Sequence, residues 1–307
     1  MTAARLPTTA HGTNRDAFSP NDWALFTTLG GIWGSSFLLM AIGLDSFHPG
    51  LVSLIRVIAA SAFLVAIPRV RRSRIDSQDR GRIALIGLTW VALPFTLFPI
   101  AQQWIASGVA GMLNGTTPIF TAILATVLLR TLPSRIQRVG LILGLAGVVL
   151  IAMPSARAGS TAAIGVVLGL GAAGCYAVSI NLAVPVLQRY GSLPVMSRVV
   201  WMATPMMIPF GLYAVPRSSF SVPSLLATLA VGVLGTGLAF LLAGRLAGSV
   251  GATRSAFVAY VIPVVALILG IVFRSEQISV VSVVGIALVI SGAILASRRE
   301  LRAPLSA

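Results

Sequence analysis

Few side chains in this sequence have the types and spacing that covalent or metal chemistry needs. The histidines are His11 and His48, both in polar stretches, and Cys175 is the single cysteine. A nucleophile needs a base within hydrogen-bond reach, and a zinc site needs several His, Cys or carboxylate ligands. The sequence therefore predicts no enzyme active site, no metal site and no cofactor, and it excludes a disulfide within the chain.

Polar and aromatic side chains inside long apolar runs are instead the candidates for binding a substrate. Such polar groups are costly in lipid and are expected to face a cavity or a partner. The residues that we assign to substrate binding are Trp33, Ser36, Trp90, Asn114, Tyr176, Asn181, Thr236 and Tyr260. Packing in the core is the alternative for the aromatic residues. A bond to a backbone carbonyl is the alternative for Asn114 and for the hydroxyl groups.

Arg56 is the clear charge inside an apolar run, where a lone arginine needs a partner or water. Asp45 and Glu276 are predicted at the same side of the membrane and are its candidate partners. We assign Arg56 and Glu276 as structural charges. A structural tether is favoured for Arg56, and direct contact with substrate is the alternative.

Pro118 and Pro263 lie in the middle of two apolar runs. Proline removes a helical hydrogen bond, and in a membrane helix neighbouring groups or a wet cavity can satisfy the freed carbonyl. We assign both as hinge residues beside a cavity, against the alternative of two bends in well-packed helices.

The composition places most of the surface in lipid. The chain of 307 residues is 57% hydrophobic and 9% charged, with a mean hydropathy of +0.96, whereas soluble domains carry about 25% charged residues. The net charge of +15 would suit nucleic acid, but the arginines gather between apolar runs, where they act as orientation signals. The expected partners are therefore a lipid bilayer and a small-molecule substrate, and no nucleic acid. Either a monomer or a homodimer fits the sequence.

The apolar runs predict an all-α integral membrane protein with ten transmembrane helices. The segments are 23–44, 51–68, 83–104, 108–129, 136–153, 162–187, 194–215, 224–243, 255–273 and 280–296. Every second connection is rich in arginine, which by the positive-inside rule places both termini in the cytoplasm. The polar stretches 1–22 and 298–307 are then cytoplasmic tails.

The two halves of the chain repeat without a gap. When Pro118 is placed on Pro263, Gly140 falls on Gly285 and Gly147 on Gly292. Because each half holds an odd number of predicted segments, the second must lie upside down relative to the first. The predicted domains are two inverted five-helix repeats, 23–153 and 162–297, an arrangement frequent in secondary transporters.

Three stretches carry a resemblance to a known family. They are GGIWGSSF (Gly30–Phe37), SGVAGMLNGTTPIFTAIL (Ser107–Leu124) and LLAGRLAGSVGATRSAFVAYVIPVVALILGIVFRSE (Leu241–Glu276). They resemble the EamA family of the drug/metabolite transporter superfamily, whose first-repeat Gly-Glu pair is here Arg130 and Thr131. The resemblance implies a ten-helix transporter of the bacterial inner membrane, often an exporter of amino acids, related metabolites or drugs.

We therefore expect a secondary transporter that exports small amphipathic metabolites by alternating access. Ion-driven carriers commonly hold a carboxylate in mid-membrane, and none is predicted here, so transport down the substrate gradient is the simplest mechanism. Coupling through Asp45 or Glu276 stays open. The alternatives are an importer or exchanger of the same solutes, or a channel or membrane scaffold protein.

Overall fold

The computed structural model describes residues 19–72, 75–129, 135–157, 160–250 and 255–296. These residues form helices joined by short turns, and no strand occurs among them. Each predicted apolar segment is helical over most of its length.

The first half of the chain contributes α1 to α8. Their bounds are α1 Pro20–Leu44, α2 Pro49–Val65, α3 Pro68–Arg72, η1 Ser77–Asp79, α4 Arg80–Gly87, η2 Leu88–Ala92, α5 Leu93–Ala101, α6 Ser107–Asn114, α7 Thr117–Leu129 and α8 Arg135–Arg157. The second half contributes α9 Ser160–Tyr190, α10 Ser192–Ala214, η3 Val215–Arg217, α11 Val222–Ala230, η4 Val231–Leu238, α12 Ala239–Val250, η5 Ala256–Tyr260, α14 Val261–Arg274 and α15 Val280–Ala296.

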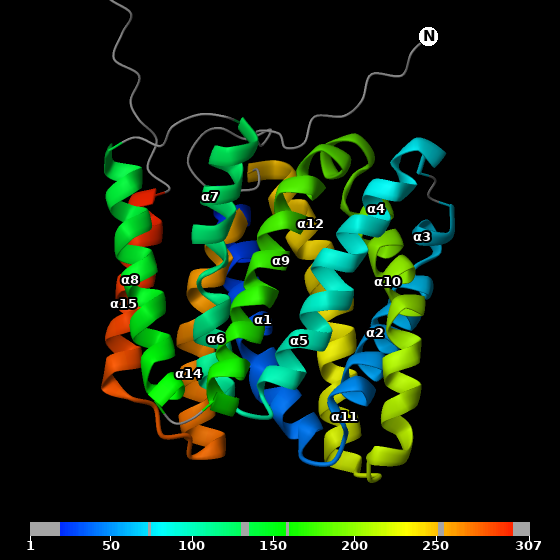
Figure 1. Ribbon diagram of the computed structural model, residues 1–307. Helices are drawn as coiled ribbons and strands as arrows, with labels where there is room; N and C mark the ends of the chain where they lie inside the picture. The colour runs from blue at the N-terminus through cyan, green and yellow to red at the C-terminus, as the bar shows by residue number, and fades with distance from the viewer. Residues whose placement is uncertain (1–18, 73–74, 130–134, 158–159, 251–254, 297–307) are drawn as a thin grey trace, which may run out of the picture.

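The helices form one bundle whose segments alternate in direction (Figure 1). The start of α1 and the end of α15 lie at the same end, which we call the arginine-rich end because α4 and α8 begin there with Arg80 and Arg135. The other end is called the opposite end. The first helix of each half, α1 and α9, runs in opposite directions, as an inverted repeat requires.

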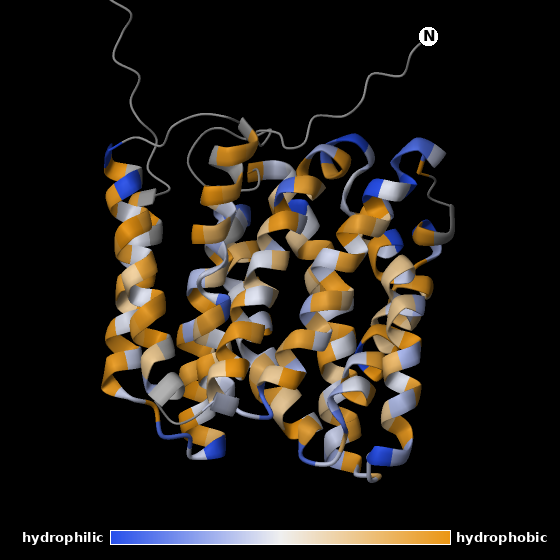
Figure 2. Ribbon diagram, in the orientation of Figure 1, coloured by the Kyte–Doolittle hydropathy of each residue, from blue (hydrophilic) through white to orange (hydrophobic). Residues whose placement is uncertain are grey.

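Apolar residues cover the middle of the bundle, and hydrophilic residues gather at its two ends (Figure 2). Among the described residues, five helices are long and apolar enough to cross a membrane, and four further apolar helices are shorter. Val127, Ile142, Val167 and Leu226 are each more than 60% exposed. A surface this apolar belongs in hydrocarbon, so the protein is a multi-pass membrane protein.

Local sequence explains how several helices begin. Pro20 starts α1 behind Ser19, whose side chain accepts a hydrogen bond from the Asp22 backbone N–H, while the Asp22 carboxylate accepts from Ser19. This capping box satisfies donors that the first helical turn leaves free. Pro49 likewise occupies the first position of α2, where its missing N–H removes no helical bond.

The helices lose their regularity at matching places in the two halves. The third segment of each half contains a π-helical stretch, η2 in the first and η4 in the second. The fourth segment of the first half breaks at Gly115 and Thr116, between α6 and α7. Its counterpart in the second half is the 3-10 turn η5, which precedes α14. The irregularities therefore follow the sequence repeat.

Glycines bring α8 and α15 into close contact at two matching points. A Cβ on Gly147 would lie 2.5 Å from the Gly285 carbonyl oxygen, and a Cβ on Gly292 would lie 2.5 Å from the Gly140 carbonyl oxygen. Since Gly140 corresponds to Gly285 and Gly147 to Gly292, each contact is the image of the other. Small residues allow this approach, as they do in many membrane helix pairs.

Replacing Gly292 with alanine should destabilise the protein, because the new Cβ would also lie 2.9 Å from the Gly144 Cα, and backbone atoms cannot rotate away. Overpacking of this kind typically costs about 1–3 kcal/mol. The matched control is Gly31→Ala, since a Cβ there meets nothing within 4 Å. Thermal melting of the two purified variants in one detergent should show a lower midpoint for Gly292→Ala alone. Equal midpoints would contradict the close contact.

Candidate functional site

A cavity lies between the two halves of the bundle, near its middle. It holds about 820 Å³ of atom-free space, counting the part open to solvent. Its lining comes from α1, α2, η2, α5, α6, α7, α9, α12, η5 and α14. The walls run from Met40 and Phe98 on the side of the opposite end to Leu246 and Ser255 on the side of the arginine-rich end.

The cavity brings together five of the residues assigned to substrate binding, which are Trp33, Ser36, Trp90, Asn114 and Tyr176. The other three are not in its lining. Asn181 is buried and donates to the Ala177 carbonyl at 2.9 Å. Tyr260 is buried in the apolar core beneath the cavity wall. Thr236 is fully buried behind Arg56.

The π-helical stretch η4 explains how Thr236 and its neighbour present polar groups to the interior. The Thr236 hydroxyl donates to the Val231 carbonyl, five residues back, at 3.2 Å. The Gly235 carbonyl accepts the indole N–H of Trp33 at 3.0 Å. Single π-helical turns of this kind occur often at functional sites.

Arg56 lines the cavity and has partners that differ from those expected. Its Nε donates to the Thr236 hydroxyl at 2.9 Å, and its guanidinium carbon lies 3.5 Å from the centre of the Phe95 ring. The expectation of Asp45 or Glu276 as partner is wrong, because both carboxylates bond elsewhere. The side chain is only 7% exposed and lines the cavity, so the positive charge lies in the cavity wall.

Gly232 allows α2 to pass close to η4 at Arg56. A Cβ on Gly232 would lie 2.6 Å from the Arg56 carbonyl oxygen and 2.6 Å from the Ala59 Cβ. Gly237 packs against α2 in the same way, since a Cβ there would lie 2.6 Å from the Phe63 Cδ1. This close packing of α2 on η4 sets the position along the bundle at which the Arg56 guanidinium contacts Thr236.

An aromatic wall surrounds Arg56. Phe240 packs against Trp33, Trp90 and Phe95, with ring centres 5.6–6.4 Å apart. Phe98 stacks on Tyr176 at 6.1 Å. The sequence assignment missed Phe95, Phe98 and Phe240. Helical spacing could have found Phe240, which lies four residues after Thr236 and therefore on the same face.

Asn114 offers a polar group with no partner within the described residues. Its side chain is 5% exposed, and its Oδ1 accepts no hydrogen bond there. Because Asn114 lines the cavity, an unsatisfied acceptor at this place is suited to a donor group of a bound molecule.

The two assigned hinge regions touch each other. Pro118 is the second residue of α7, directly after the break at Gly115 and Thr116. Pro263 lies in the first turn of α14, after the 3-10 turn η5. A Cβ on Gly115 would lie 2.6 Å from the Pro263 Cγ. The irregular part of one half therefore packs against its counterpart in the other.

The comparisons with known proteins agree with this architecture. The model of the EamA-like transporter family matches residues 22–153 and again residues 163–298. The chain belongs to the EamA-like transporter family. A protein of known crystal structure also shares its fold, with a TM-score of 0.66 at 18% identity over 91% of this chain and 97% of the other.

Several relatives of this EamA-like transporter are named as transporters. A probable terminal-alkyne amino-acid exporter of Streptantibioticus cattleyicolor is 30% identical, over 91% of this chain and 94% of the relative. YdfC of Bacillus subtilis, a transporter, is 25% identical over 85% and 86% of the two chains. YedA of Escherichia coli K12, an inner membrane transporter, is 27% identical over 86% of each chain.

At the opposite end of the transporter, Glu276 ties the second half to the first. One carboxylate oxygen accepts the Ser107 backbone N–H at 2.9 Å and the Ser107 hydroxyl at 2.5 Å, and the other accepts the Gly108 N–H at 2.9 Å. Glu276 thus caps the N-terminus of α6, where a negative charge is favoured. Asp45 and Arg274 form an exposed bidentate pair nearby, at 2.6 and 2.8 Å.

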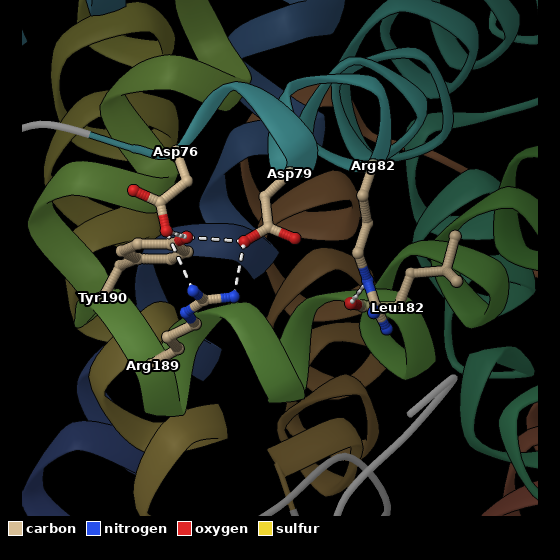
Figure 3. Close-up of polar contacts among 6 residues, drawn as sticks. All are labelled: Asp76, Asp79, Arg82, Leu182, Arg189 and Tyr190. Atoms are coloured by element: carbon tan, nitrogen blue, oxygen red, sulfur yellow. Dashed lines mark hydrogen bonds and ion pairs between the residues drawn. The ribbon is translucent and has the colours of Figure 1, made fainter. Parts of the chain in front are cut away.

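At the arginine-rich end, a second polar cluster joins the halves (Figure 3). Arg189, near the end of α9, donates to Asp76 at 2.8 Å and to Asp79 at 3.2 Å. The Tyr190 hydroxyl also donates to both carboxylates. Beside this cluster, Arg82 donates to the Leu182 carbonyl at 3.0 Å. Each end of the EamA-like transporter is therefore held by its own polar contacts between the halves.

Glu276→Gln should lower the free energy of unfolding by about 1–3 kcal/mol, because the carboxamide leaves a buried N–H donor of α6 without an acceptor. The control is Asp45→Asn at the same end, which breaks a pair of the exposed kind worth about 0–1 kcal/mol. Thermal melting in detergent should show the larger decrease for Glu276→Gln. A larger decrease for Asp45→Asn would contradict the capping role.

Proposed function

We propose that this transporter exports small amphipathic metabolites, such as amino acids and related compounds, by alternating access. The observation that carries the proposal is the cavity between the inverted halves, with an aromatic wall, one guanidinium and one unsatisfied amide oxygen. Substrate sites between inverted repeats are the rule in such carriers. The relative named as a probable terminal-alkyne amino-acid exporter supports the same class of solute and the direction of transport.

Alternating access would use the irregular segments that meet at Gly115 and Pro263. Regular helices resist bending, whereas a break, a 3-10 turn and two π-helical stretches supply places where the backbone can adjust. The polar contacts at the two ends would open in turn, those of Glu276 for release and those of Arg189 for loading.

The membrane orientation follows from the arginines. In this proposal the arginine-rich end faces the cytoplasm, as the positive-inside rule predicts, and both termini are cytoplasmic. The relative YedA, named an inner membrane transporter, supports the bacterial inner membrane as the location. Substrate would then enter from the end beside Leu246 and Ser255 and leave past Met40.

The energy source in this proposal is the substrate gradient. No Asp or Glu lies among the residues that line the cavity, so the lining offers no carboxylate to carry a proton or bind sodium. A carrier without coupling runs in either direction, and import or exchange of the same solutes is the second candidate function.

Purified protein in liposomes tests the proposal. The vesicles are loaded with a panel of amino acids, nucleosides and cationic dyes, and uptake of the labelled compound is followed. We expect saturable uptake that an internal load of the same amino acid accelerates. Rates that do not saturate and show no acceleration would favour a channel, and no uptake of any panel member would exclude this class of function.

Pro118→Ala and Pro263→Ala should each slow exchange while leaving apparent substrate affinity nearly unchanged, because a regular helix would stiffen the moving region. A loss of about ten-fold corresponds to roughly 1.4 kcal/mol in the barrier. Pro209→Ala is the matched control, since Pro209 is an exposed proline inside α10, away from the cavity. Exchange at the wild-type rate in both hinge variants would remove the bends from the mechanism.

A further inference from the structure

We propose that the Arg56 guanidinium binds the carboxylate of the transported molecule, which makes the substrates small carboxylates with an apolar body. This inference deepens the proposed function and rests on it. It reverses the assignment of Arg56 as a structural charge, and it follows from what Arg56 does and does not contact.

The charge on Arg56 lacks an acidic partner within the described residues. The acids in that part of the chain are committed elsewhere: Asp22 to the α1 cap, Asp45 to Arg274, Asp76 and Asp79 to Arg189, and Glu276 to α6. A positive charge in a membrane protein interior is expensive and marks a substrate or ion path unless a counter-charge compensates it. A ligand that carries the counter-charge would complete the site.

The geometry leaves free the part of the guanidinium that a carboxylate would bind. Nε is occupied by the Thr236 hydroxyl, and within the described residues the two terminal amino groups make no hydrogen bond. Those groups form the planar fork that matches a carboxylate with two parallel bonds. Phe95 holds the plane from one face at 3.5 Å, and Thr236 fixes its rotation. The cation is thereby pre-organised.

The rest of the cavity fits the remainder of such a molecule. The aromatic wall of Trp33, Trp90, Tyr176 and Phe240 suits an apolar body. The unsatisfied Oδ1 of Asn114 suits an N–H donor such as an ammonium group. An α-amino acid with an apolar side chain has all three parts. The carboxylate is the part that the site requires, because it alone neutralises the buried charge.

The structural alternative is that Thr236 and Phe95 are sufficient partners for Arg56. A cation–π contact and one hydrogen bond do stabilise a guanidinium. On that reading, Arg56 holds α2 against η4, and binding would not depend on the charge of the substrate. The two readings therefore differ in their response to the carboxylate of the ligand.

Matched pairs of ligands test the proposal on the wild-type protein. Each pair is an apolar L-amino acid and its own amide, for example phenylalanine and phenylalaninamide, or leucine and leucinamide. Binding to purified protein is followed by calorimetry and by tryptophan fluorescence, to which Trp33 and Trp90 of the cavity wall contribute. We expect at least one acid to bind about 10- to 100-fold more tightly than its amide, the range for charge-assisted hydrogen bonds. Equal binding of acid and amide in every pair, or no binding of any acid, overturns the proposal.

Arg56→Gln should abolish the preference for the acid, and Arg56→Lys should retain part of it, since lysine keeps the charge and loses the fork. Arg245→Gln is the matched control, because it removes an exposed arginine in α12 and should leave the preference intact. Thr236→Val keeps the charge and removes its orienting partner, so it should weaken acid binding less than Arg56→Gln. An acid preference that survives in Arg56→Gln overturns the proposal.

The exchange assay separates this inference from the proposed function. Wild-type protein that exchanges amines, nucleosides or amides but no carboxylate would keep the carrier function and overturn the role of Arg56. Carboxylate exchange that Arg56→Gln lowers about ten-fold or more, and that Arg245→Gln does not, supports both; the factor reflects loss of one charge-assisted pair.

Discussion

Backbone hydrogen bonding in hydrocarbon is the constraint on which the rest of this structure depends. Lipid offers no partner for a free N–H or carbonyl, so membrane segments stay helical wherever they face it. In this protein the regular helices are interrupted at η2, η4, η5 and the break after Asn114. The side chains that the π-helical stretches expose, Leu88 and Leu234, are apolar. Polar groups of η4 have partners within the bundle: the Gly235 carbonyl accepts from Trp33, and the Thr236 hydroxyl accepts from Arg56. Irregular backbone thus occurs where a cavity can use it.

The same constraint explains the use of glycine. A cavity between helices must be balanced by tight packing elsewhere, or the bundle would hold voids that lose dispersion contacts. Gly34, Gly111 and Gly232 each bring a neighbouring helix into close contact beside the cavity. The close packing of α8 on α15 lies at one side of the bundle in Figure 1, away from the substrate region. Rigid packing and adjustable segments are therefore separated in space.

Much of this arrangement could be predicted from the sequence, and the remainder fails for identifiable reasons. Apolar run length predicted the helices, and the paired prolines predicted where the two halves are irregular. Trp33, Trp90, Asn114 and Tyr176 were found because polar or amphipathic groups stand out in an apolar segment. Phe95 and Phe98 were missed because most faces of these helices are apolar and do not show how the helix is rotated.

The partners of Arg56 were predicted wrongly because the sequence shows at which side of the membrane each charge lies, but not which residues surround it. Asp45 and Glu276 do lie toward the opposite end, but Arg274 and the N-terminus of α6 are nearer to them. The π-helical stretch η4 could not be predicted either, because a wider helical turn has no signature in the amino-acid composition. That stretch turns Thr236 toward Arg56. The orientation of Arg56 in the site therefore depends on a local distortion that the sequence does not reveal.

The polar contacts at the two ends follow the repeat but differ in strength. The end of α1 meets the start of α11 through the Ser224 hydroxyl and the Ile42 carbonyl at 2.8 Å, and the end of α9 meets η1 through Arg189 and Asp79. Exposed ion pairs and neutral hydrogen bonds each contribute about 1 kcal/mol or less, so these two contacts nearly balance. Glu276 adds a part-buried, charge-assisted cap at the opposite end, and the corresponding residue in the first half, Thr131, has no carboxylate. At the arginine-rich end, Asp76 and the Tyr190 hydroxyl add contacts of their own. In the proposed cycle, the contacts between the halves at each end would have to open before substrate could pass that end.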